Sequence, residues 1–96
     1  MERESQPVRR CVVRFVGHVQ GVGFRQTSAH AARSHDVTGY VRNEPDGSVE
    51  LVAEGAESEI RALLDDIQDR MSGRIRHMHE GWSGATGQYD RFEVRY

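Results

Sequence analysis

An apolar run, a glycine-rich stretch and a helical pattern follow one another without interruption in the first third of the chain. The run CVVRFVG, from Cys11 to Gly17, predicts a strand that is buried on both faces. The stretch HVQGVG comes next, and from Phe24 onward FRQTSAHAARSH places its small and apolar residues at helical spacing. A strand that continues into a helix returns to its own sheet by a right-handed crossover. The chain is therefore restricted to folds in which a helix packs on a sheet.

The residues after position 38 predict a hairpin and then a second helix. Gly39 opens a strand over 40–43, and Glu-Pro-Asp-Gly at 44–47 has the composition of a type I turn. The returning strand covers 48–54, where residues of one face are apolar and the other face is partly polar. Residues 57–71 predict a helix with acids in its first turn and an arginine in its last. Its apolar stripe consists of Ile60, Leu63, Leu64, Ile67 and Met71.

Two further strand patterns complete the chain. In residues 74–82, Ile75 and Met78 break the two-residue period, which predicts a bulge or a change of register. In residues 91–96 apolar and charged residues alternate, which predicts an edge strand. The order βαββαβ with an extra strand predicts an α+β fold of the ferredoxin-like type. Two helices then cover one face of an antiparallel sheet, and the fifth strand lies at its edge.

Ninety-six residues suffice for one domain, which we expect at 11–96, preceded by a flexible arm at 1–10. The arm mixes charges of both signs and has no apolar stretch, so it predicts neither a signal peptide nor a membrane span. Cys11 is the single cysteine, which excludes an internal disulfide and any zinc site that needs two cysteines. A reducing, cytoplasmic location is the simplest interpretation.

All 13 positively charged side chains are arginine, because the chain contains no lysine. Schiff-base chemistry and a nucleotide-binding loop with its lysine are therefore excluded. Residues 1–43 carry seven arginines against three acids, whereas residues 44–96 carry six arginines against twelve acids. A bound anion is thus expected in the first half. The net charge of −2 argues against a general nucleic-acid binder, which is normally basic.

Three segments are expected to meet at one edge of the sheet. The first and second strands run parallel, so the loop at 17–23, the helix start with Arg25 and the strand end with Asn43 become neighbours. A glycine loop that enters a helix directs free N–H groups and the positive end of the helix dipole at one point, which suits a phosphate. The Arg25 guanidinium adds a permanently charged fork. Gln26 stands where a dinucleotide fingerprint would have its third glycine, so that motif is absent.

Two stretches, G-H-V-Q-G-V-G-F-R at 17–25 and G-Y-V-R-N-x-x-D-G-x-V-E at 39–50, resemble the signatures of the acylphosphatase family in sequence and in spacing. The resemblance extends over 12–96, through V-E-x-V-A-E-G at 49–55 and the final F-x-V-R-Y. It implies an enzyme that hydrolyses the carboxyl-phosphate bond of acylphosphates to a carboxylate and inorganic phosphate. Two departures stand out, namely His18 in the loop and Met-Ser-Gly-Arg at 71–74, where the family often has a glycine-proline stretch.

The resemblance also implies the roles of individual residues. Arg25 would bind the phosphoryl group and Asn43 would position the attacking water, as the two catalytic residues. The phosphate-binding residues would be Gly17, His18, Val19, Gln20, Gly21, Val22, Gly23, Phe24 and Arg25. No metal and no cofactor would take part, and the protein would act as a monomer without nucleic acid or membrane. Inorganic phosphate would be both the product and a competitive inhibitor.

Several alternatives stay open at this level. His18 is either a nucleophile that forms a phosphohistidine or a solvent-facing loop residue that favours anions when protonated. His77 and His79 face the same way on a strand and are either metal ligands or a surface pair. Trp82 and Tyr89 either line the acyl side of the site or serve packing.

A binding module is the alternative class of function. RNA recognition needs paired exposed aromatics on central strands, and the first strand offers only Phe15. A non-catalytic module that binds phosphate or carbamoyl phosphate within a larger protein is the stronger alternative. The absence of a second domain in this sequence favours a free-standing enzyme.

Overall fold

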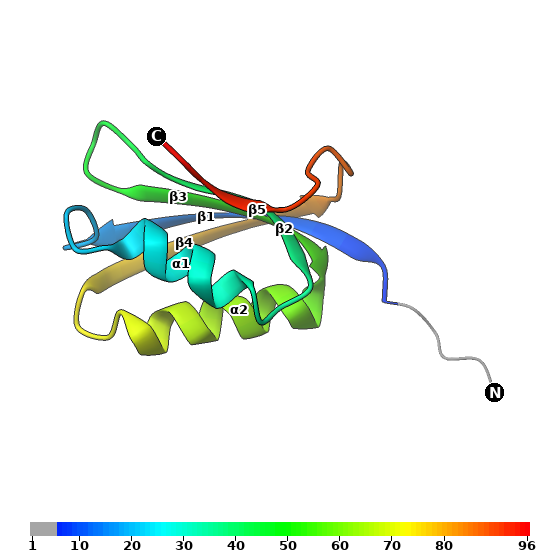
Figure 1. The fold of residues 1–96 in the computed structure, drawn as a ribbon, viewed down its shortest axis with the longest axis horizontal. Coiled ribbons are helices and arrows are strands. Elements are labelled where there is room, and N and C mark those ends of the chain that lie inside the picture. Colours follow the sequence, from blue (N-terminus) through cyan, green and yellow to red (C-terminus); the bar gives the residue numbers. More distant parts are fainter. Residues whose placement is uncertain (1–5) are drawn as a thin grey trace.

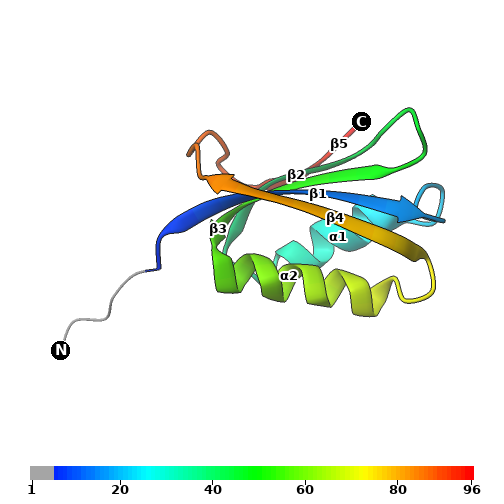
Figure 2. The ribbon, with the colours of Figure 1, turned by 180° about the vertical axis from the view of Figure 1, so that it is seen from behind.

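The computed structural model describes residues 6–96 and contains five strands and two helices in that range. The strands are β1 (Val8–Gly17), β2 (Val37–Asn43), β3 (Val49–Ala56), β4 (Ile75–Gly84) and β5 (Phe92–Arg95), and the helices are α1 (Phe24–Ala32) and α2 (Glu57–Arg70). Both helices lie on the same face of the sheet, and the opposite face is open (Figures 1 and 2). The α+β, ferredoxin-like βαββαβ arrangement with a fifth strand is therefore confirmed.

The strand order across the sheet is β4-β1-β3-β2-β5. β1 is antiparallel to β3 and to β4, and β2 is antiparallel to β3. β5 lies at the edge of the sheet, as expected, and pairs with β2 in parallel, a direction that the sequence did not predict, so the complete sheet is mixed. The reason is the connection at 85–91, which reverses the chain after β4 and carries it across the open face to the far edge. A strand that reverses β4 must run in the direction of β2.

Two strand ends that lie far apart in the sequence are level in the sheet. Val49 pairs with Phe15 of β1 and with Asn43 of β2, as the parallel direction of these strands requires. The Phe15 ring also packs against Phe24 at the start of α1, with 4.9 Å between the ring centroids. The end of β1, the start of α1 and the end of β2 thus form one rigid edge.

The irregularity expected near Ile75 is present as a bulge in β4. Val16 pairs with His77 and Gly17 with Ile75, so Arg76 has no partner opposite it in β1. Gly17 has φ +142°, and a Cβ at this position would come within 2.4 Å of the Arg74 carbonyl oxygen. Only glycine lets the end of β1 approach the bulge this closely.

Several element boundaries differ from the expected ones. β1 begins at Val8, so residues 8–10 belong to the sheet rather than to a flexible arm, because Arg9 and Arg10 pair with β3 and β4. Residues 1–5 of the expected arm lie outside the described residues. β2 begins at Val37 rather than after Gly39, and α1 ends at Ala32, followed by a turn.

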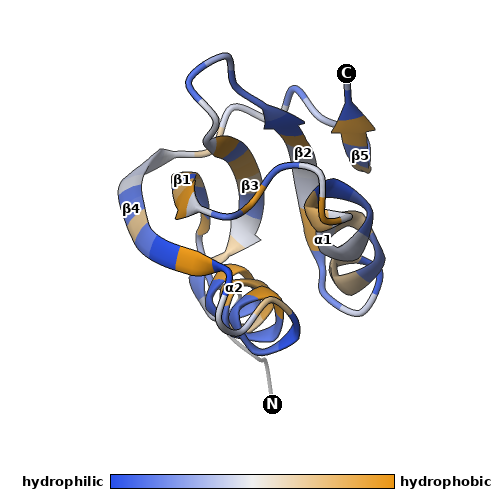
Figure 3. Cartoon of the chain, turned by 90° about the vertical axis from the view of Figure 1, so that its left-hand side faces the viewer, coloured by the Kyte–Doolittle hydropathy of each residue, from blue (hydrophilic) through white to orange (hydrophobic). Residues whose placement is uncertain are grey.

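The core lies between the sheet and the helices, and apolar residues line this interface in Figure 3. The stripe expected on α2 is buried there, together with the inward-facing residues of β1. The fully buried side chains include Val13, Phe15, Phe24, Leu51, Ile60, Leu63, Leu64 and Ile67. This burial stabilises the domain and holds both ends of the β1–α1 loop.

Glu54 anchors the long connection between β4 and β5 on the open face. Its side chain is 4% exposed and accepts hydrogen bonds from the main chain of Thr86 and Gly87 and from the Arg10 guanidinium. Burial by itself would raise the pKa of Glu54, but these hydrogen bonds outweigh it and hold the pKa below its ordinary value. The folded state therefore favours the carboxylate.

Glu54→Gln is expected to lower the free energy of unfolding by about 1 to 2 kcal/mol at pH 7, because charged hydrogen bonds are lost. A depressed pKa in the folded state contributes stability above the ordinary carboxyl pKa, and this contribution disappears on acidification. The difference between wild type and variant should therefore shrink as the pH falls below about 4. Urea unfolding at both pH values measures this, and a difference independent of pH would contradict the role given to the charge.

Candidate active site

The conformation of the loop between β1 and α1 favours contacts between its main chain and a ligand. Gly21 and Gly23 have φ +74° and +77°, in the left-handed region that glycine adopts without strain. Gly23 is the N-cap of α1, and no side chain caps this helix start. The first-turn N–H groups, which have no acceptor within a helix, are therefore available to an anion together with the positive end of the helix dipole.

A pocket of about 110 Å³ lies at this helix start. It is lined by Val19, Gly21, Gly23, Phe24, Arg25, Gln26 and Asn43. Arg25 and Asn43 thus meet in one pocket, as expected, and Arg25 carries the only charge among these residues. The pocket is much smaller than other hollows of the structure, which suits a small anionic group such as phosphoryl. Larger hollows of about 570 and 600 Å³ lie elsewhere; the first reaches Ala56, the N-cap of α2, but its lining contains Asp36 and Glu54 and no arginine.

The expected phosphate-binding residues separate into different environments. Val19 and Phe24 are almost fully buried, so they can offer only their main chain to a ligand. Val22 packs against the core. Gly17 and His18 line a different hollow, on the side of the loop that faces β4. The pocket itself is therefore made by the second half of the loop and by Arg25.

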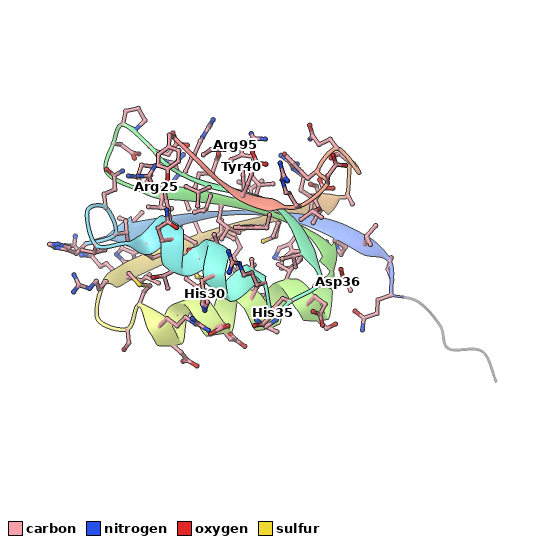
Figure 4. The ribbon with its side chains drawn as sticks, in the orientation of Figure 1. Arg25, His30, His35, Asp36, Tyr40 and Arg95 are labelled. Atoms are coloured by element: carbon pink, nitrogen blue, oxygen red, sulfur yellow. The ribbon has the colours of Figure 1, made fainter. Side chains whose placement is uncertain are left out.

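The Arg25 side chain is held by the C-terminal end of β5. Its Nη1 donates a hydrogen bond to the Arg95 carbonyl oxygen at 3.2 Å, and its guanidinium carbon lies 4.6 Å from the centroid of the Tyr96 ring. Gln26 Nε2 donates to the Tyr96 hydroxyl at 3.3 Å. Figure 4 shows Arg25 at the start of α1, on the side where β5 and Arg95 lie. Sequence reasoning missed these contacts, because residues about 70 positions away carry no local signal of them.

Gln20 links the loop to the β2–β3 hairpin. Its Nε2 donates hydrogen bonds of 2.8 Å to the carbonyl oxygens of Glu44 and Ser48. Gln20 was expected to bind phosphate, but its side-chain nitrogen is used by these two hydrogen bonds. They hold the loop against Glu44, the residue that follows Asn43. Gln20 fixes the loop relative to Asn43.

Gln20→Glu is expected to lower kcat/KM for an acylphosphate by about tenfold, since a carboxylate cannot donate to two carbonyl oxygens and a misplaced site loses catalysis steeply. Gln20→Met, which keeps the length and removes the donor without introducing a charge, should show a similar loss. Steady-state kinetics measures both variants. Full activity in either one would show that these hydrogen bonds do not position the loop.

The remaining candidate residues lie away from the pocket. His18 is exposed and faces the hollow next to β4, which argues against a phosphohistidine. The rings of His77 and His79 lie 6.2 Å apart, and residues 6–96 hold no group of three or more His, Cys, Asp and Glu side chains suited to a metal ion. Trp82 pairs with Cys11, near the other end of β1, and Tyr89 packs on Tyr40.

Comparisons with known proteins all point to one family. The family model described as Acylphosphatase matches residues 11–94. The chain is 40% identical to an acylphosphatase of Salinibacter ruber, over 96% of this chain and 98% of that protein. It is 42% identical to the acylphosphatase of Caldanaerobacter subterraneus, over 85% and 92% of the two chains.

Solved structures show the same fold. The crystal structure of acylphosphatase from Bacillus subtilis superimposes with a TM-score of 0.81 at 27% identity, over 93% of this chain and 99% of that one. HypF of T. kodakarensis matches with a TM-score of 0.78 at 29% identity, over 92% of this chain but only 12% of its own.

The ferredoxin-like α+β fold and the matches over nearly the whole chain identify a small phosphohydrolase. The full-length matches favour such a hydrolase over a non-catalytic module. The chain belongs to the acylphosphatase family, and it is an enzyme that hydrolyses acylphosphates. Neither helix within residues 6–96 is long and apolar enough to cross a membrane.

Proposed function

We propose that the enzyme hydrolyses its acylphosphate by in-line attack of a water that Asn43 positions on a phosphoryl group held by Arg25 and the main chain of the loop at 17–23. The observation that carries this proposal is the shared pocket at the start of α1, in which Arg25 and Asn43 meet. The guanidinium, the free N–H groups and the helix dipole all favour the negative charge of the phosphoryl oxygens. Phosphoryl transfer requires positioning and charge stabilisation more than covalent help.

The bond changes need no further catalytic group. The water oxygen forms a bond to phosphorus, and the bond between phosphorus and the acyl oxygen breaks. The carboxylate leaves with the electron pair and needs no proton, because it is a weak base. The water proton passes to an oxygen of the phosphoryl group. Asn43 can accept a hydrogen bond from the water and carries no charge that would repel the phosphate.

In this proposal no metal ion takes part, since Arg25 and the main chain supply the positive charge. The enzyme acts as a monomer. Inorganic phosphate competes with substrate for the loop. A reducing, cytoplasmic location is supported by cysteine usage, since Cys11 is the single cysteine of the sequence.

Hydrolysis of an aryl acylphosphate in ¹⁸O-labelled water with a chelator present tests the proposal. Attack at phosphorus places the label in inorganic phosphate, whereas attack at the acyl carbon places it in the carboxylate. We expect labelled phosphate, equal rates with and without chelator, and competitive inhibition by phosphate. Labelled carboxylate would overturn the attack at phosphorus, and a requirement for added metal would overturn the metal-free mechanism.

A further inference from the structure

Two exposed arginines beside the phosphate loop lack a carboxylate partner within residues 6–96. Eight other arginines form salt bridges, namely Arg9, Arg10, Arg14, Arg42, Arg61, Arg70, Arg91 and Arg95. Arg74 and Arg76 are in none of these pairs, and with His18 they line a hollow of about 290 Å³. No carboxylate lines this hollow. We call His18, Arg74 and Arg76 the basic edge.

The backbone attaches the basic edge firmly to the loop. The His18 N–H donates a hydrogen bond of 2.8 Å to the Arg74 carbonyl oxygen. Gly17 pairs with Ile75, and the bulge leaves Arg76 outside the strand pairing. Bulges commonly re-aim a side chain next to an active site. The basic edge is therefore held in place by the same close approach that requires glycine at position 17.

The basic edge and the phosphate pocket lie on the two sides of one loop. His18 lines the hollow of the basic edge, whereas Val19, the next residue, lines the pocket that contains Arg25. The β1–α1 loop and the α2–β4 connection lie at the same end of the molecule in both views (Figures 1 and 2). Arg74 and Arg76 therefore lie at the same end of the molecule as the phosphate pocket, on the other side of the loop.

The charge distribution of the chain makes these two arginines favourable for an anionic substrate. The chain has a net charge of −2, and residues 44–96 contain six arginines against twelve acids, so most of this segment repels an anion. A phosphate monoester group carries about 1.5 to 2 negative charges near neutral pH. Clustered charge at the mouth of a site raises the local concentration of a charged substrate and its association rate.

We propose that the basic edge attracts the acylphosphate anion to the loop and raises kcat/KM without taking part in the chemical step. The inference rests on the proposed binding of the phosphoryl group by the loop and Arg25. Attraction of the substrate by the basic edge differs from direct contact with the phosphoryl group, because its effect on kcat/KM depends strongly on salt concentration. The screening length is about 30 Å at 0.01 M ionic strength and about 3 Å at 1 M, so only low salt allows Arg74 and Arg76 to act on the pocket.

The test compares kcat and KM of wild type with the double variant Arg74→Gln/Arg76→Gln, using benzoyl phosphate. The matched control is Arg33→Gln/Arg91→Gln, which removes two positive charges from exposed positions. Arg33 follows the end of α1 and Arg91 precedes the start of β5, and both of these ends are remote from the pocket. At about 10 mM ionic strength we expect kcat/KM of the first variant to fall about fivefold, with kcat unchanged. The control should fall less than twofold.

At about 1 M ionic strength the difference between the variants should vanish. The charge-reversal variant Arg74→Glu/Arg76→Glu should enlarge the effect at low salt, and inorganic phosphate should inhibit both variants less strongly there. Equal kcat/KM in wild type and variant at low salt, an equal loss in the control, or a loss that persists at high salt would each overturn the proposal. The ¹⁸O experiment and the Arg25 variants test the proposed function independently, because they do not touch the basic edge.

Discussion

Arg25→Ala is expected to lower turnover of an aryl acylphosphate by about a thousandfold or more, while the domain stays folded. Arg25 carries the only charge among the residues that line the phosphate pocket, so its loss leaves the phosphoryl oxygens with main-chain N–H groups alone. The side chain is half-buried at the first turn of α1 and contributes little to the core, which makes a purely structural effect small. Competitive inhibition by inorganic phosphate should be lost as well.

Two controls separate charge from geometry in this experiment. Arg33→Ala removes the same side chain just beyond the other end of α1 and should leave turnover within about twofold, as surface changes usually do. Arg25→Lys keeps the positive charge but loses the planar fork that binds two oxygens, and it should recover only a small part of the activity. If Arg25→Ala keeps more than a tenth of the wild-type turnover, the guanidinium does not bind the reacting group.

Asn43→Ala is expected to lower kcat by about a hundredfold to a thousandfold, with phosphate inhibition nearly unchanged. Asn43 is uncharged, so it adds little to the binding of an anion, and its carboxamide acts on the water. This pattern differs from that of Arg25→Ala, in which turnover and phosphate binding disappear together. Stopped assays of phosphate release, with phosphate as inhibitor, distinguish the two patterns.

Asn43→Asp is the matched variant for the water-positioning role. It keeps the size and the hydrogen-bond acceptor but places a negative charge in the pocket, so phosphate inhibition should weaken in Asn43→Asp but not in Asn43→Ala. Thermal unfolding of both variants shows whether the end of β2 stays intact. Full activity of Asn43→Ala would remove Asn43 from the mechanism, and a loss of phosphate inhibition in that variant would turn it into a binding residue.

Most of the elements could be predicted because their signals are local. The apolar run that ends at Gly17 is β1, and the stripe with Leu63 and Leu64 is the buried face of α2. The Glu-Pro-Asp-Gly turn closes with a hydrogen bond from the Gly47 N–H to the Glu44 carbonyl oxygen. The break in period between Ile75 and Met78 correctly predicted the bulge. In each case side-chain period or backbone preference within a few residues decides the conformation.

The expectation that Arg25 lies close to Asn43 required one further inference, namely the relative direction of β1 and β2. Right-handed crossover makes β1 and β2 run the same way, and this rule has few exceptions. The prediction therefore needed no knowledge of side-chain contacts. By contrast, the parallel pairing of β5, the anchoring of Glu54 and the role of Gln20 depend on which segments meet across the sheet.

The sequence by itself determined the βαββαβ order, the glycine loop before α1 and the proximity of Arg25, at the start of α1, to Asn43, at the end of β2. Only the tertiary structure decided that Arg25 rests against Arg95 and Tyr96, and that Arg74 and Arg76 lie beside the loop without a salt bridge to any carboxylate of residues 6–96. The physical reason is distance along the chain. Backbone preferences act over a few residues and are visible in the sequence, whereas the partners of a charged side chain are chosen by packing between segments that no local pattern connects.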